Sequence, residues 1–150
     1  MQPTNLQPQG ETLQFMQQLW KLVHALDVRS KRMAKVLGVT GPQRLVIRVL
    51  GQSSMLTARE LSDTLGIHPS TLTGVLARLE GQGLLQRHID VEDRRRARFT
   101  LTAAGKRIDR ERKGTVEAAV RRALARADPG VAKSTAQMIA LLVAELSRAD

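Results

Sequence analysis

The segment from residue 69 to residue 82 carries side chains suited to contacting a nucleic acid. Ser70, Thr73, Gly74 and Arg78 recur at spacings that place them on one side of a helix. Hydroxyl groups can bond phosphates or base edges, and an arginine can reach guanine or phosphate. Apart from Arg78 these side chains are short, so the backbone of this helix can approach the floor of a major groove. The alternative is an ordinary amphipathic helix whose small residues contact nothing.

A second segment, at residues 90–98, is rich in arginine. Four guanidinium groups follow three acidic residues within nine positions: Arg94, Arg95, Arg96 and Arg98 come after Asp90, Glu92 and Asp93. Arginine fits narrow minor grooves by charge and shape. Asp93 could hold one arginine so that another projects. The alternative is a solvated charge run in a turn.

Other chemistry finds little support in the sequence. There is no cysteine, and the three histidines are scattered without the spacing of metal ligands. No Ser-His-Asp grouping stands out. Gly81 and Gly83 are not followed by the Lys-Ser/Thr pair of a phosphate-binding loop. We therefore expect no catalytic residues, no metal, no cofactor and no enzymatic activity.

Composition narrows the partner. The 150 residues carry a net charge of +10, which favours a polyanion. Only 2% are aromatic, which argues against platforms that stack single-stranded bases. No apolar run is long enough to cross a membrane. The first ten residues lack the features of a signal peptide, so we expect a cytoplasmic protein.

The elements that must position these residues follow from periodicity and capping signals. Thr57 and Glu60 form a capping box for a helix over 58–65, and Gly66 begins a three-residue turn. His68 precedes Pro69 at the cap of a second helix, which runs to about residue 80. Its apolar positions recur at i, i+3, i+4 and i+7, and these are Leu72, Val75, Leu76 and Leu79. This is a helix-turn-helix pattern.

Two short strands, 84–89 and 97–101, follow the helix-turn-helix, with the arginine-rich segment as their hairpin loop. That order describes a winged helix. We expect a helix over 43–50 before it, with Leu45, Val46, Val49 and Leu50 facing inward.

Long helices flank the winged helix. A pattern over 11–37 ends at Gly38, and its length suggests packing on a second chain. A long helix over 102–127, softly interrupted by Gly105 and Gly114, and a helix over 131–147 follow. The predicted fold is mostly α (α+β), a single domain over 1–150. It comprises a disordered arm (1–10), a winged helix-turn-helix (42–101) and dimerisation helices (11–37 and 102–149).

The sequence resembles the MarR family of bacterial regulators. The resemblance lies in VTGPQRLVIRVL at 39–50, LTARELSDTLGI at 56–67, PSTLTGVLARLEGQGLLQR at 69–87, DRR at 93–95 and LTAAG at 101–105. It implies a two-fold dimer that binds a pseudo-palindromic operator in double-stranded DNA and represses transcription. It also implies that Ser70, Thr71, Thr73 and Arg78 lie in the major groove and that Asp93, Arg94 and Arg95 form the wing motif.

The same resemblance implies a small-molecule effector in a pocket between the dimer helices and the winged helix, where family members bind anionic aromatic compounds. Trp20 and His24 stand one turn apart on the first helix and could line it, although packing in a core is the alternative. Arg44 and Arg48 could pair with an anionic effector or be surface charge. The missing cysteine excludes the family's peroxide-sensing mechanism, and the scattered histidines argue against its zinc-responsive one.

Two other functions stay open. A nonspecific architectural protein could coat DNA with the same basic surface. A protein-interaction module could keep a winged helix that no longer binds DNA. Substitution of Arg78 or Arg95 by alanine distinguishes the protein-interaction module from a DNA-binding protein, because only the DNA-binding protein should lose DNA affinity.

Overall fold

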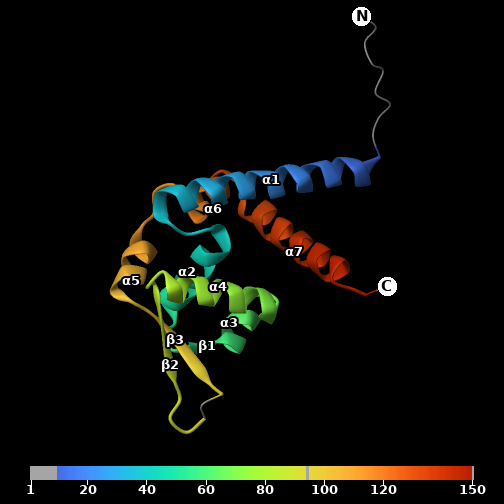
Figure 1. Ribbon diagram of the computed structural model, residues 1–150. Helices are drawn as coiled ribbons and strands as arrows, with labels where there is room; N and C mark the ends of the chain where they lie inside the picture. The colour runs from blue at the N-terminus through green and yellow to red at the C-terminus, as the bar shows by residue number, and fades with distance from the viewer. Residues whose placement is uncertain (1–9, 94, 150) are drawn as a thin grey trace, which may run out of the picture. The chain divides into compact units, whose positions relative to one another are not determined.

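A computed structural model describes residues 10–93 and 95–149. Its helices and strands, shown in Figure 1, are α1 (Glu11–Leu37), α2 (Gly41–Gln52), β1 (Leu56–Thr57), α3 (Ala58–Leu65), α4 (Pro69–Gly81), β2 (Leu85–Ile89), β3 (Ala97–Leu101), α5 (Ala103–Arg110), α6 (Val116–Arg126) and α7 (Pro129–Leu146). The mostly helical winged helix-turn-helix expected from the sequence is confirmed. None of the described helices has the length and apolar character needed to cross a membrane.

The chain forms two compact units, one ending at Glu111 and the other beginning at Arg112. The first contains α1 to α5 and the sheet, and the second contains α6 and α7. The single domain over 1–150 stays a prediction. The expected arm lies outside the described residues, apart from Gly10.

The sheet positions the wing. Its strands are antiparallel in the order β1-β3-β2, with Phe99 of β3 opposite both Leu56 and Arg87. The short strand β1 lies directly before α3, where the sequence pattern predicts no strand. Two residues give no alternation to detect, and the strand exists because β3 lies beside it.

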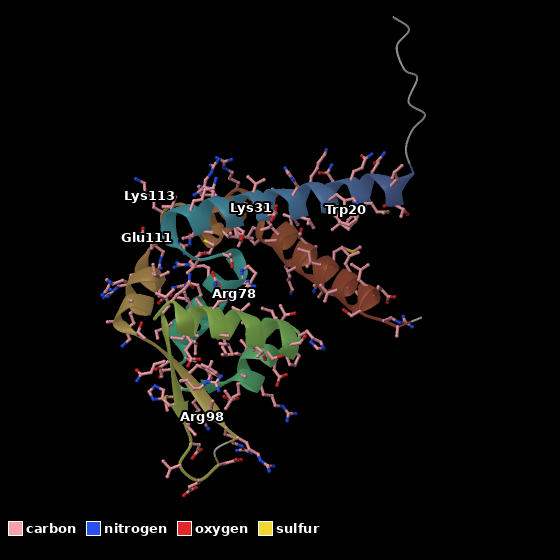
Figure 2. All side chains as sticks on the ribbon, in the orientation of Figure 1. Trp20, Lys31, Arg78, Arg98, Glu111 and Lys113 are labelled. Carbon is pink, nitrogen blue, oxygen red and sulfur yellow. The ribbon has the colours of Figure 1, made fainter. Side chains whose placement is uncertain are left out.

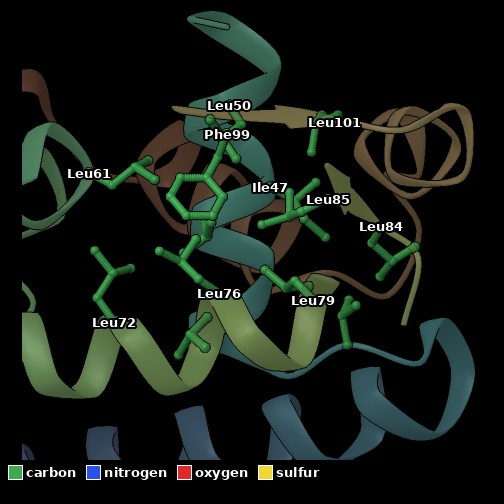
Figure 3. Close-up of a cluster of buried hydrophobic side chains, with 13 residues drawn as sticks. Ile47, Leu50, Leu61, Leu72, Leu76, Leu79, Leu84, Leu85, Phe99 and Leu101 are labelled. Carbon is green, nitrogen blue, oxygen red and sulfur yellow. The ribbon is translucent and has the colours of Figure 1, made fainter. Parts of the chain in front are cut away.

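One hydrophobic cluster holds α2, α3, α4 and the sheet together. Ile47 of α2, Leu61 of α3, Leu76 of α4 and Phe99 of β3 all lie in it (Figure 3). Each of these side chains is at most 2% exposed. Burying a side chain of this size contributes about 1.5–3 kcal/mol, so the cluster fixes where α4 and the wing stand on the first unit.

One prediction about α2 is wrong. Leu45, expected to face inward, is 53% exposed, whereas Ile47 is fully buried. The helix packs against α4, β3 and α5, so its buried arc is broad and includes polar positions. Arg44 and Gln43 lie in that arc. The periodicity of apolar residues does not predict the burial of such polar side chains.

The single helix expected over 102–127 is also wrong, because α5 ends at Arg110 and α6 begins at Val116. Between them Gly114 adopts a left-handed φ of +76°. Thr115 then caps α6, its hydroxyl accepting a hydrogen bond from the main-chain N–H of Ala118 at 3.2 Å. These features make 111–115 a connection between the two units.

Arg44 explains where α5 ends. Its guanidinium donates to the main-chain carbonyl oxygens of Ile108, Asp109 and Glu111, the last at 2.5 Å. The last carbonyls of a helix lack partners within the helix. Here the side chain of Arg44 on α2 supplies these partners. The end of α5 is therefore set by a residue more than sixty positions earlier.

Candidate nucleic-acid interface

The turn between α3 and α4 sets the direction of α4. Gly66 ends α3 in a left-handed conformation with φ +62°, which favours glycine. His68 caps α4, its Nδ1 accepting from the main-chain N–H of Ser70 at 3.2 Å. Pro69 follows at the first helical position, where a missing N–H costs nothing. The expected role of His68 at the helix cap is confirmed.

The two sides of α4 divide as the sequence predicted. The apolar side, Leu72, Val75, Leu76 and Leu79, is buried. The other side is exposed and consists of Ser70, Thr71, Thr73, Gly74, Ala77 and Arg78. This exposed polar side of α4 is called the polar face below.

The hydroxyl groups of the polar face are already oriented. Ser70 Oγ lies 2.7 Å from His68 Nδ1, and Thr73 Oγ1 donates to the carbonyl of Pro69 at 2.9 Å. A hydroxyl that donates to its own helix keeps its lone pairs for a partner. Thr73 is therefore arranged to accept from a donor, such as a base amino group, and not to donate to a phosphate.

Arg78 is the long side chain of the polar face. It is exposed, and among the described residues its guanidinium has no hydrogen-bond or ion-pair partner. Figure 2 labels it on α4. An unengaged guanidinium next to short neighbours is available for a bidentate contact with guanine or for a phosphate.

Asp93 stabilises the hairpin loop between β2 and β3. The main-chain N–H of Arg96 donates to the Asp93 carbonyl at 2.8 Å, and the N–H of Arg95 donates to Asp93 Oδ1 at 3.0 Å. Arg96 Nε lies 3.6 Å from Asp93 Oδ2. The prediction that Asp93 holds one arginine is confirmed, and the exposed Arg95 side chain has no partner in the described part of the chain. Arg94 lies outside the described residues.

Arg98 has a different task from the loop arginines. Its Nη1 donates to the carbonyl of Met55 at 2.8 Å and lies 4.0 Å from Glu60 Oε2. It therefore ties the wing to the start of α3. Figure 2 labels Arg98 on the sheet. Arg87 on the neighbouring strand is also engaged, because it stacks over Phe99 at 5.3 Å and lies 3.6 Å from Glu80.

A groove of about 560 Å³ runs between the start of α3 and the wing. Five arginines and two carboxylates line it: Arg59, Arg87, Arg95, Arg96, Arg98, Glu60 and Asp63. Hydrogen bonds from Thr57 lower the pKa of Glu60, so this carboxylate stays charged while it serves the capping box. The excess of arginine still makes the groove attractive to phosphate.

Arg59 is one member of this groove that sequence reasoning missed. It is exposed on the first turn of α3, and no described residue bonds its side chain. Arg59 is the second residue after the cap residue Thr57. This position could have indicated a phosphate contact, since the first turn of a helix in this motif can face a phosphate.

The four residues considered for an effector pocket divide into two pairs. Trp20 is 66% exposed on α1, and His24 is exposed one turn later. Arg44 is 1% exposed and bonded to α5, so it is not a surface charge. Arg48 is half-buried and pairs with Asp109 at 2.6 Å. His88 bonds Thr100 across the two wing strands at 2.8 Å.

A helix-turn-helix with an exposed polar second helix, followed by an arginine-rich hairpin, defines a winged helix-turn-helix protein. Residues 39–97 match the family model described as MarR family.

Curated proteins are similar to part of the chain. The chain is 36% identical over 90 residues to the HTH-type transcriptional repressor Rv2887 of Mycobacterium tuberculosis, a match that covers 60% of this chain and 65% of that protein. The chain thus spans slightly less than two thirds of this curated relative.

Solved structures share the fold. The S. aureus MepR-DNA complex superimposes with a TM-score of 0.75 at 16% identity, covering 89% of this chain and 98% of that one. The M. tuberculosis MarR family protein Rv2887, in complex with p-aminosalicylic acid, superimposes with a TM-score of 0.55 at 28% identity, covering 83% and 94%.

Proposed function

We propose that the protein is a homodimeric regulator that binds a specific sequence in double-stranded DNA and represses transcription. The observation that carries the proposal is the polar face of α4, which stands exposed on a buried apolar base and is followed directly by the arginine-lined wing. A repressor among its relatives and the DNA complex of a structural neighbour support it.

Within this proposal, α4 lies in the major groove. Ser70, Thr71, Thr73 and Gly74 lie close to the bases, and Arg78 makes the long-range contact. Arg94, Arg95 and Arg96 enter the flanking minor groove, whereas Arg98 holds the wing in place. Arg59 binds the phosphate backbone at the edge of the site.

The dimer rests on apolar side chains that are exposed on the helices flanking the winged helix. On α1 these are Leu13, Phe15, Met16, Trp20, Leu22, Val23, Leu26, Val28 and Val36, and on α7 they are Val131, Met138, Ile139, Leu141, Val143 and Leu146. No residue of α6 or α7 is buried within the chain. Exposed apolar surface of this extent marks an interface, and a second copy of the chain is the partner we propose.

Release from DNA by a small anionic effector is part of the proposal, and the Rv2887 complex with p-aminosalicylic acid supports it. Trp20 and His24 remain candidates for that pocket, because both are exposed. Arg44 and Arg48 serve instead to hold α5. As a DNA-binding regulator and not an enzyme, the protein works in the cytoplasm without a cofactor.

Binding of Arg78→Ala to a duplex selected from a random library tests the assignment of α4. We expect a loss of about 1–3 kcal/mol and a relaxed preference at one base pair of each half-site. Arg107→Ala, which removes an exposed arginine from α5, is the matched control and should bind normally. Unchanged affinity for Arg78→Ala would favour a protein-interaction module.

A further inference from the structure

A second groove, of about 600 Å³, lies on the first unit, and none of the residues considered for an effector pocket lines it. Its walls come from the end of α2, the loop before β1, the two wing strands and α5. The lining residues include Leu50, Met55, His88, Thr100, Lys106 and Arg110. The volume falls within the range of small-molecule sites, about 300–1,000 Å³.

The polar side of this groove is positively charged. Lys106 and Arg110 stand four residues apart on α5, so their side chains lie on the same side of the helix. Both are exposed, and neither forms a side-chain hydrogen bond or ion pair with any described residue. The lining carboxylate, Asp109, is already paired with Arg48 at 2.6 Å. Two cations are thus left for an anion.

The rest of the groove offers apolar surface. Leu50 and Leu101 form part of its wall, and Met55 is 43% exposed beside them. Met55 also has a φ of +64°, the left-handed region that side chains other than glycine seldom adopt. Such a conformation is strained and is retained where surrounding structure enforces it, often at ligand sites.

We propose that this groove binds a small amphipathic carboxylate. Its charge lies between Lys106 and Arg110, and its apolar body covers Met55. The site goes beyond the proposed function, since it contains none of Trp20, His24, Arg44 or Arg48.

The position of Met55 gives such a ligand a route to the wing. The carbonyl of Met55 accepts the 2.8 Å hydrogen bond from Arg98, and His88 and Thr100 belong to the wing strands. A ligand that prefers one position of this loop shifts the wing by as much as its difference in affinity allows.

Calorimetric titration of the full chain with 2-naphthoate tests the site, with neutral 2-naphthamide as the ligand control. We expect saturable binding of the carboxylate below about 1 mM and much weaker binding of the amide. The double variant Lys106→Gln/Arg110→Gln should bind about tenfold more weakly. Arg107→Gln removes an exposed charge from the same helix outside the groove and should bind normally. Thermal melting verifies that the variants fold.

A second readout locates the ligand. With the methionine methyl groups labelled with ¹³C and the Met55 signal assigned through Met55→Leu, naphthoate should shift that signal and leave that of Met138 in place. Absence of saturable binding, equal binding by the double variant, or an unmoved Met55 signal would each overturn the proposal. None of these readouts involves DNA, so their failure is separate from a failure of the proposed function.

Discussion

The guanidinium of Arg98 donates a 2.8 Å hydrogen bond to the carbonyl of Met55, a residue with a φ of +64°. This bond joins the central strand of the sheet to the loop that leads into α3. It also separates the wing arginines by task. Arg98 holds the wing, Arg96 is paired with Asp93, and Arg95 has no described partner.

The division of tasks predicts different effects of removing Arg95 and Arg98. Arg95→Ala should weaken binding of all duplexes about equally and reduce the slope of log K against log salt by about 1, because it removes one phosphate or minor-groove contact. Its melting temperature should not change. Fluorescence anisotropy at several salt concentrations, together with thermal melting, measures both.

Arg98→Ala should instead lower stability as well as affinity, by about 1 kcal/mol of unfolding free energy for the lost hydrogen bond. Urea unfolding measures the loss. Equal stability of the Arg95→Ala and Arg98→Ala variants would contradict the assignment of Arg98 to holding the wing.

Gly74 gives a prediction in which stability and binding move in opposite directions. A Cβ atom at Gly74 meets no atom within 4 Å, so Gly74→Ala should stabilise α4 by about 0.5–1 kcal/mol. The added methyl group stands on the polar face, where the account places the DNA, and should reduce affinity about fivefold. Thermal melting and duplex binding measure the two effects.

The matched control for Gly74 is Gly81→Ala. Gly81 ends the same helix and is equally open, but it lies outside the proposed DNA contacts. This variant should keep wild-type affinity. If Gly74→Ala also binds like the wild type, the polar face does not lie against DNA.

Periodicity in the sequence was enough to predict α1 and the two sides of α4. The bounds 11–37 of α1 and the buried set Leu72, Val75, Leu76 and Leu79 are confirmed by the structure. Both features depend on local signals: a glycine after the last turn in one case, and a regular apolar stripe against a single core in the other. The expected hairpin also depends on residues close together in the chain.

The break between α5 and α6 could not be predicted in the same way. The segment 102–127 is helical by local pattern, and α5 ends where the buried Arg44 of α2 takes its carbonyls. That contact joins positions far apart in the sequence, so no local pattern contains it. The two readings offered for Arg44, effector contact and surface charge, both missed a buried guanidinium that binds main-chain oxygens.

The role of Arg44 is testable by removing its guanidinium group while keeping an unbranched apolar stem. Arg44→Met should lower the free energy of unfolding by about 3 kcal/mol, since it leaves carbonyl oxygens of α5 buried without donors. Arg44→Lys should recover only part of this, because an ammonium group lacks the planar fork that serves several oxygens. Urea unfolding of the three proteins measures the difference. Wild-type stability for Arg44→Met would contradict this role.

Glu60 makes one part of the stability depend on pH. Its pKa lies below the ordinary value of 4.5 because it accepts hydrogen bonds from the main chain and the hydroxyl of Thr57, with Arg98 and Arg96 contributing. A lowered pKa in the folded state stabilises the protein above pH 4.5, and this stabilisation is lost as pH falls through the folded value. The melting-temperature advantage of the wild type over Glu60→Gln should therefore shrink between about pH 6 and about pH 3. A constant difference over that range would show that the charge of Glu60 plays no part.

Fluorescence anisotropy at about 0.15 M salt measures whether two copies of α4 read a symmetric duplex. A duplex selected from a random library is compared with a scrambled duplex of the same composition. We expect an inverted repeat with half-sites about 10 base pairs apart, two protomers per duplex and a preference of at least about a thousandfold over the scrambled sequence. Equal affinity for both duplexes, or one protomer per duplex, would contradict this expectation.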